Sequence, residues 1–140
     1  MSMDSPDTSK SLEQLEGKAW GPPEYDSHLV LECHRLHRLP LRDFTMADYR
    51  RMISQSICLE FLAPLALQCL QKEPFLEAEL YEGDLLCALL TSEKEFWRTH
   101  KELNAAAEQL AAYAESKLPE LLPKAQRRHA TEAIAHFRKS

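Results

Sequence analysis

The segment from Cys33 to His37 brings potential metal-binding side chains close together, as Cys-His-Arg-Leu-His. On a helix, His34 and His37 would share one face, while Cys33 would point partly towards the core. Two ligands do not define a zinc site, so at least one more would have to come from elsewhere in the chain. Because no His-Glu-x-x-His or Cys-x-x-Cys motif is present, a solvated histidine face is the favoured interpretation. We therefore predict no metal and no other cofactor.

Paired carboxylates could in principle support acid–base catalysis. Such pairs occur at Glu13 and Glu16, at Glu77 and Glu79, and at Glu82 and Asp84. Catalysis would need a pocket that separates the two pKa values, whereas these acids lie in polar segments that do not suggest burial. The sequence also contains no glycine-rich phosphate loop and no motif of a nucleophilic triad. We predict no catalytic residues and no enzymatic activity.

The charges of the chain are unevenly distributed along its 140 residues. The net charge of −5 comes from blocks of −5 (1–32), +3 (33–51), −6 (52–97) and +3 (98–140). Two acidic blocks make direct coating of nucleic acid a poor fit, but they suit a protein that binds a nucleic-acid-binding partner. Solvated helix faces would explain the same pattern.

Apolar residues recur at helical spacing, and no alternating strand pattern competes with them. The sequence predicts an all-α fold, a compact single-domain bundle of about six to eight short helices. We expect residues 1–10 to form a disordered arm and 11–140 to form the helical domain. Within it, 85–90 should be a helix buried on nearly every side, preceded by Asp84 as its N-cap. The four isolated cysteines are expected to be buried and reduced.

Several short strings in a fixed order carry a family resemblance. They are Leu12-Glu13-Gln14-Leu15-Glu16-Gly17, Trp20-Gly21, Pro23-Glu24-Tyr25-Asp26-Ser27, and Tyr81-Glu82-Gly83-Asp84-Leu85-Leu86, with Pro40-Leu41, Phe44-Thr45 and Pro64-Leu65-Ala66-Leu67 between them. Over residues 11–90 the chain resembles the immunity proteins of bacterial contact-dependent growth inhibition systems. It departs from the family pattern at Cys58, where glycine is common, and at Glu82, where proline is common. Residues 91–140 are less familiar.

The resemblance implies a cytoplasmic protein that binds the toxin domain of a large secreted effector as a heterodimer and masks its active site or its access to substrate. Such toxins are often nucleases with a basic groove, so acids beside aromatic residues are the candidate toxin-binding residues. These are Glu24, Tyr25 and Asp26, and Glu77, Glu79, Tyr81, Glu82 and Asp84. The resemblance itself rests on Tyr25 and on the string from Tyr81, so Glu77, Glu79 and Glu82 are the stronger candidates.

Two other functions remain open from the sequence. The runner-up is a helical adaptor that contacts nucleic acid through its basic last helix, with Arg127, Arg128 and Arg138. The third is a metal enzyme that uses His34 and His37. In the favoured interpretation the chain has no direct nucleic-acid partner. It also has no membrane partner, because its longest apolar run, 61–67, is far shorter than the roughly 20 residues of a membrane-spanning helix. Whether it forms a homo-oligomer is left open.

Overall fold

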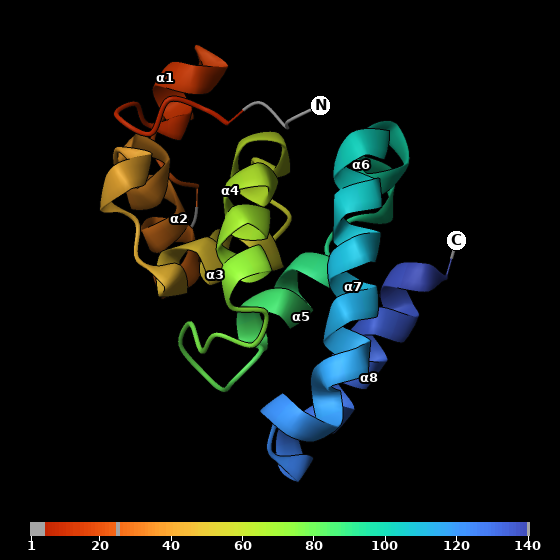
Figure 1. The fold of residues 1–140 in the computed structure, drawn as a ribbon. Coiled ribbons are helices and arrows are strands. Elements are labelled where there is room, and N and C mark those ends of the chain that lie inside the picture. Colours follow the sequence, from red (N-terminus) through yellow and green to blue (C-terminus); the bar gives the residue numbers. More distant parts are fainter. Residues whose placement is uncertain (1–4, 25, 140) are drawn as a thin grey trace.

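Figure 1 shows a computed structural model of the chain, which describes residues 5–24 and 26–139. These residues form α1 (Leu12–Glu16), α2 (His28–Arg38), the 3-10 helix η1 (Leu41–Asp43), α3 (Met46–Ser54), α4 (Leu59–Lys72), α5 (Asp84–Leu90), α6 (Lys94–Thr99), α7 (Lys101–Leu121) and α8 (Lys124–Arg138). The described residues contain eight α-helices and no named strand, which confirms the all-α prediction.

Local side-chain caps explain where the first helices begin. Ser11 and Gln14 form a capping box at α1, in which the Gln14 N–H donates to the Ser11 hydroxyl at 3.2 Å and the Ser11 N–H donates to the Gln14 side chain at 2.9 Å. Thr45 and Asp48 form the same arrangement at α3. Ser27 caps α2. A serine or threonine whose partner lies three residues later is a sequence signal for a helix start, and it marks the starts of α1 and α3.

Two prolines lie inside helices rather than at their ends. Pro64 comes well after Leu59, the first residue of α4, and α7 continues past Pro119 to Leu121. A proline inside a helix removes one hydrogen bond, to the carbonyl four residues earlier. Here those carbonyls belong to Glu60 and Glu115, which are exposed, so water can take the place of the missing donor.

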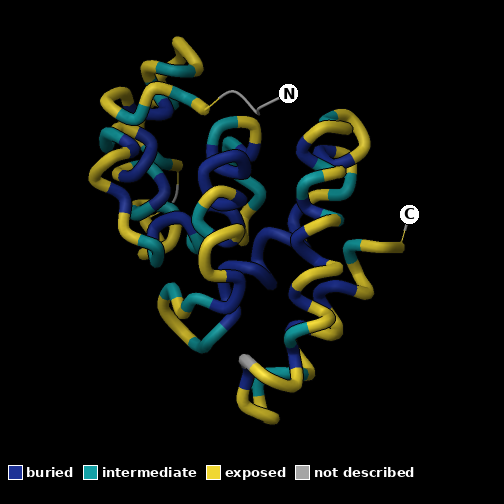
Figure 2. The backbone as a smooth tube through the Cα atoms, viewed as in Figure 1, coloured by how far each residue is buried: buried dark blue, intermediate teal, exposed yellow. Residues whose placement is uncertain are grey.

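α5 is the centre of the fold. All seven of its residues are buried, which the sequence predicts for 85–90 but not for Asp84 (Figure 2). The helix contacts α3, α4 and α8. In Figure 1, α1 to α4 lie on one side of α5 and the α7–α8 pair on the other. α7 also packs against α4, so one hydrophobic core joins the two sides. Burial of α5 therefore fixes the course of the loop that leads into it.

The end of the predicted N-terminal arm runs beside η1. The carbonyls of Thr8 and Lys10 accept hydrogen bonds from the backbone N–H groups of Arg42, at 2.8 Å, and Leu41, at 3.0 Å. Residues 1–4 of the predicted arm lie outside the described residues.

Candidate functional site

The loop of residues 73–83, between α4 and α5, is shaped by the residue that follows it. The Asp84 carboxylate accepts hydrogen bonds from three backbone N–H groups, those of Ala78 at 2.7 Å, Glu79 at 2.9 Å and Leu80 at 2.8 Å. Glu77 and Glu82 face each other in an isolated antiparallel bridge. The loop therefore folds back on itself around one carboxylate.

Asp84 occupies a different position from the expected one. Gly83, with a φ of 87°, is the N-cap of α5, and Asp84 is the first residue of the helix. A left-handed φ suits glycine, so the cap falls one residue earlier than the sequence predicts. Asp84 is only 2% exposed, and its oxygens are occupied by the loop. We correct its assignment: it is a structural residue that shapes the loop rather than a group available to a partner.

The loop presents a leucine between acids. Leu80 is 61% exposed, Glu77 and Glu79 are exposed, and Glu82 is half-buried. Beside Glu77 lies a recess of about 420 Å³ between α3 and α4. It is lined by Met46, Cys69, Lys72, Glu73, Leu76 and Glu77. An exposed apolar side chain next to a recess and charged groups has the composition of a protein-binding surface.

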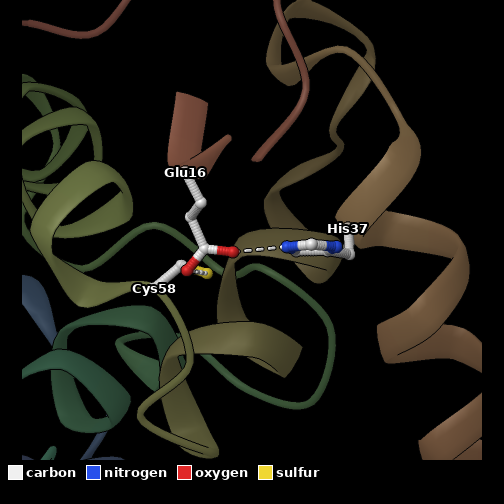
Figure 3. A group of neighbouring side chains, drawn as sticks. All are labelled: Glu16, His37 and Cys58. Atoms are coloured by element: carbon white, nitrogen blue, oxygen red, sulfur yellow. Dashed lines mark hydrogen bonds and ion pairs between the residues drawn. The ribbon is translucent and has the colours of Figure 1, made fainter. Parts of the chain in front are cut away.

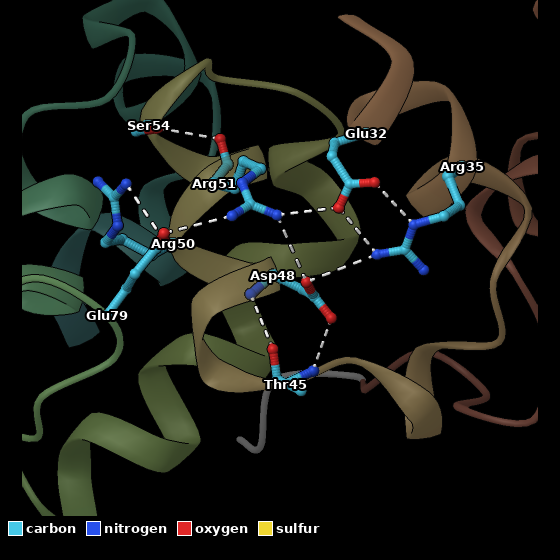
Figure 4. A network of polar contacts seen from close by, with 8 residues as sticks. All are labelled: Glu32, Arg35, Thr45, Asp48, Arg50, Arg51, Ser54 and Glu79. Carbon is cyan, nitrogen blue, oxygen red and sulfur yellow. Dashed lines mark hydrogen bonds and ion pairs between the residues drawn. The ribbon is translucent and has the colours of Figure 1, made fainter. Parts of the chain in front are cut away.

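Glu79 is not a free acid, because two arginines of α3 contact it. Its carboxylate lies 3.2 Å from Arg51 Nη2 and 3.6 Å from Arg50 Nη2. Arg51 also contacts Glu32 of α2 at 3.1 Å, so a chain of charges joins α2, α3 and the loop (Figure 4). The Arg35 guanidinium, hydrogen-bonded to Glu32 at 2.9 Å, lowers the pKa of the Glu32 carboxyl. This network was not predicted, although the basic block 33–51 next to the acidic block 52–97 was a signal for it.

Arg50 bridges the network and the base of the loop. Its Nε lies 3.9 Å from an Asp84 oxygen, which is an ion-pair contact but too long for a hydrogen bond. The same Nε is buried and has no hydrogen-bond partner among the described residues. Arg50 therefore adds positive charge beside Asp84 without donating a hydrogen bond to it, and it reaches the loop through its contact with Glu79.

Tyr81 ties the loop to the last helix. Its ring stacks on that of His129 in α8, with centroids 4.7 Å apart and planes 29° apart. Partial burial, together with the neighbouring Cys87, raises the pKa of the Tyr81 hydroxyl to about 12. Because Tyr81 is half-buried against α8, its first role here is to anchor the loop.

The second group of predicted binding residues lies between α1 and α2. Glu24 and Asp26 are exposed, and Tyr25 lies outside the described residues. Two leucines of α2 are also exposed, Leu29 by 40% and Leu31 by 45%. Apolar and acidic groups are thus displayed near the start of α2 as well as on the loop.

His34 and His37 of α2 do not form a solvated face. His37 is 1% exposed and stacks on Trp20, with centroids 3.9 Å apart, while His34 meets the same indole edge-on at 5.0 Å. His37 Nε2 lies 2.5 Å from Glu16 Oε1, and Glu16 Oε2 lies 3.4 Å from Cys58 Sγ (Figure 3). Burial of His37 against Trp20 overturns the interpretation of a solvated face.

The cations of α8, on which the nucleic-acid alternative depends, have partners within the chain. Arg138 contacts Glu108 at 3.1 Å and Glu115 at 2.9 Å. Arg128 lies 3.0 Å from Glu132, and Arg127 donates to the carbonyl of Leu122 at 2.9 Å. Each of the three arginines therefore interacts with a group of the same chain.

None of the helices in the described part of the chain has the length and apolar character needed to cross a membrane. A family model described as CDI immunity proteins matches residues 14–107, more than half of the sequence. A comparison with curated proteins found no match.

Proposed function

Because the chain belongs to the family of immunity proteins from contact-dependent growth inhibition (CDI) systems, we propose that it covers the active site of its cognate toxin with the loop of residues 73–83. Membership in this family implies toxin neutralisation. We further propose which surface binds the toxin, that the complex contains one copy of each protein, and that the toxin is a nuclease with a basic substrate groove. CDI immunity proteins are generally non-enzymatic, and binding alone is enough for this mode of inhibition.

The observation that carries the proposal is the display of Leu80. At 61% exposure, Leu80 is the most exposed large hydrophobic residue in the described part of the chain. Its backbone N–H donates a hydrogen bond to the Asp84 carboxylate, which holds this part of the loop in place. A partner that covers this leucine removes its apolar surface from water, which favours binding. Because the backbone of Leu80 is already held, ordering of the loop adds little to the entropy cost of binding.

The charges around Leu80 favour a basic partner. Neither Glu77 nor Glu82 has an ion-pair partner among the described residues, whereas Glu79 is held by Arg50 and Arg51. Glu77 and Glu82 can therefore offer negative charge to the toxin, while Glu79 mainly holds the loop against α3. Complementary charge raises the association rate and excludes partners of the wrong sign.

The start of α2 supplies a second candidate contact region. Arg51 contacts both Glu32 of α2 and Glu79 of the loop, so the two segments are joined through one side chain. We include Glu24, Asp26 and Leu29, all exposed, as a second and smaller contact region.

A double charge reversal tests the surface. Glu77→Lys with Glu82→Lys should slow association with the cognate toxin domain and abolish protection when toxin and immunity protein are co-expressed. Glu79 is left unchanged, because reversing it would place a lysine against two arginines and disturb folding. A matched control reverses two exposed acids of α7, Glu102→Lys with Glu120→Lys, and should still protect.

The outcomes distinguish an error in the proposed function from an error in the proposed binding surface. If the wild-type chain fails to neutralise the toxin, the function itself is wrong. If the wild type protects and the Glu77 and Glu82 double variant binds as fast as the wild type at low salt, only the proposed surface is wrong. Association of the wild type should also slow as salt rises, because screening limits the attraction to about 8 Å at physiological ionic strength.

A further inference from the structure

Three side chains of metal-binding type meet where α1, α2 and the start of α4 come together (Figure 3). They are Glu16, His37 and Cys58, and one ligand atom from each lies within 4.8 Å of the other two. They come from parts of the chain separated by 21 and 42 residues, so only the fold brings them together. Glu16 and Cys58 are thus the additional ligands for His37 that the sequence does not reveal.

We propose that Glu16, His37 and Cys58 form a binding site for a thiophilic divalent metal ion, Zn²⁺ in particular. Carboxylate oxygen, imidazole nitrogen and thiolate sulfur are all zinc ligands, at about 2.0–2.3 Å from the ion. In a tetrahedral site these bond lengths place ligand atoms roughly 3.3–3.7 Å apart. The Sγ–Oε2 distance of 3.4 Å already fits this range. The Nε2–Oε1 distance of 2.5 Å is a direct hydrogen bond, which the ion would replace by separating the two atoms by about 1 Å.

The surroundings hold the imidazole in position. His37 is 1% exposed, and the Trp20 ring lies against it in a stack with planes only 13° apart. A metal site gains affinity when its ligands are held in place before the ion arrives. With three protein ligands, the fourth position of a tetrahedral ion would be taken by water.

Cys58 faces the carboxylate from a backbone conformation that is unusual for its residue type. Its φ of 51° and ψ of 40° are left-handed, and it precedes α4 without any side-chain cap. Glycine would adopt this conformation at lower cost, so the structure gives no local reason for a cysteine here. A role for the thiol supplies such a reason. A Glu16–His37 ion pair alone would account for two of the three side chains and leave the cysteine unexplained.

Metal binding here must release a proton. The thiolate is the ligand, so the Cys58 S–H bond breaks, sulfur bonds to the metal and the proton passes to solvent. Affinity should therefore increase with pH. Since the sequence alone predicted no metal, this proposal rests on the three-residue geometry.

Cobalt(II) is the probe that tests the site. The full-length chain, purified without chelator and stripped of metal, should bind one equivalent of Co²⁺ and develop a thiolate-to-cobalt charge-transfer band. Zn²⁺ should displace the cobalt, abolish the band and raise the melting temperature. Cys69→Ser is the matched control, because Cys69 is also a half-buried free thiol but lies outside the cluster, and it should keep the band.

Cys58→Gly is the decisive variant. Glycine fits the left-handed backbone, so the metal-free protein should fold with unchanged or higher stability while the band and the Zn²⁺-dependent rise in melting temperature disappear. Glu16→Gln should weaken Zn²⁺ binding by roughly 100-fold or more, since even changes to groups that only support a ligand cost about 10–100-fold. A wild type without the band, or a Cys58→Gly variant that keeps the Zn²⁺-dependent rise, would overturn the proposal.

Discussion

The Asp84 carboxylate accepts a 2.8 Å hydrogen bond from the backbone N–H of Leu80, so a 2% exposed acid holds a 61% exposed leucine. The same carboxylate accepts from Ala78 and Glu79. The buried start of α5 and the exposed tip of the loop are thus one structural unit. The inhibitory surface we propose depends on a residue that cannot itself touch the toxin.

Asp84→Asn should destabilise the protein and loosen the loop. An amide offers one acceptor oxygen where three N–H groups now point, and its NH₂ group would face donors. We expect a loss of about 2–4 kcal/mol in the free energy of unfolding, since hydrogen bonds to a buried charged group are stronger than average. Urea unfolding measures this, with the exposed Asp43→Asn as a control that should stay within about 0.5 kcal/mol of the wild type. A control-sized effect for Asp84→Asn would show that the carboxylate does not hold the loop.

Leu80→Ala should separate binding from stability. The side chain is largely exposed, so unfolding should change by no more than about 0.5 kcal/mol. If Leu80 is a central contact, its truncation should cost at least about 2 kcal/mol of binding, or roughly 30-fold in the Kd for the toxin domain. Tyr113→Ala, which removes a 50% exposed side chain of α7, should leave the Kd unchanged. Equal Kd values for the Leu80 variant and the wild type would remove the leucine from the interface.

Features encoded within a few residues could be predicted from the sequence. The capping boxes of Ser11 with Gln14 and of Thr45 with Asp48 span three residues each, so side chain and backbone partner lie in one short string. The burial of α5 followed from six consecutive apolar residues. Helix ends were less predictable where proline was involved, because a proline within a helix costs one hydrogen bond but does not by itself end the helix.

The candidate sites depended on contacts that no local pattern contains. Arg51 and Glu79 are 28 residues apart, and the ion pair between them removes Glu79 from the freely available acids. Asp84 was predicted to be an exposed acid. An acidic residue at the start of a helix has the same sequence pattern whether its carboxylate faces solvent or accepts hydrogen bonds from the preceding loop. His37 was assigned to a polar face, since only the packing of Trp20 shows that this position is covered.

Trp20→Ala should destabilise the chain less than the loss of a fully buried tryptophan. Truncating a fully buried indole costs roughly 3–5 kcal/mol, but Trp20 is only half-buried, so we expect about 1–2 kcal/mol by urea unfolding. Protection against the toxin should fall only as far as folded protein is lost. Unchanged stability together with lost toxin binding would instead make Trp20 a contact residue.

Alkaline pH should destabilise the fold through Cys87 and Tyr49. Burial raises the pKa of the Cys87 thiol to about 11 and that of the Tyr49 hydroxyl to about 12, above the unfolded values of about 8.5 and 10. A group whose pKa is raised in the folded state contributes its full stability below the unfolded pKa and loses that contribution as the pH rises to the folded one. Between about pH 8.5 and 11 the unfolded chain ionises at Cys87 while the folded chain does not.

The contribution of Cys87 can be isolated by comparing pH profiles. One pKa unit corresponds to about 1.4 kcal/mol, so the loss that Cys87 causes up to pH 11 should be roughly 2–3 kcal/mol. Cys87→Ala will lower stability at pH 7 by making a small cavity, but its free energy of unfolding should fall less steeply with alkaline pH than that of the wild type. Urea unfolding at pH 7.5 and pH 10.5 gives the two slopes. Parallel profiles would mean that the Cys87 thiol ionises with similar ease in the folded and unfolded chains, so that its burial beside Tyr81 does not hold the proton.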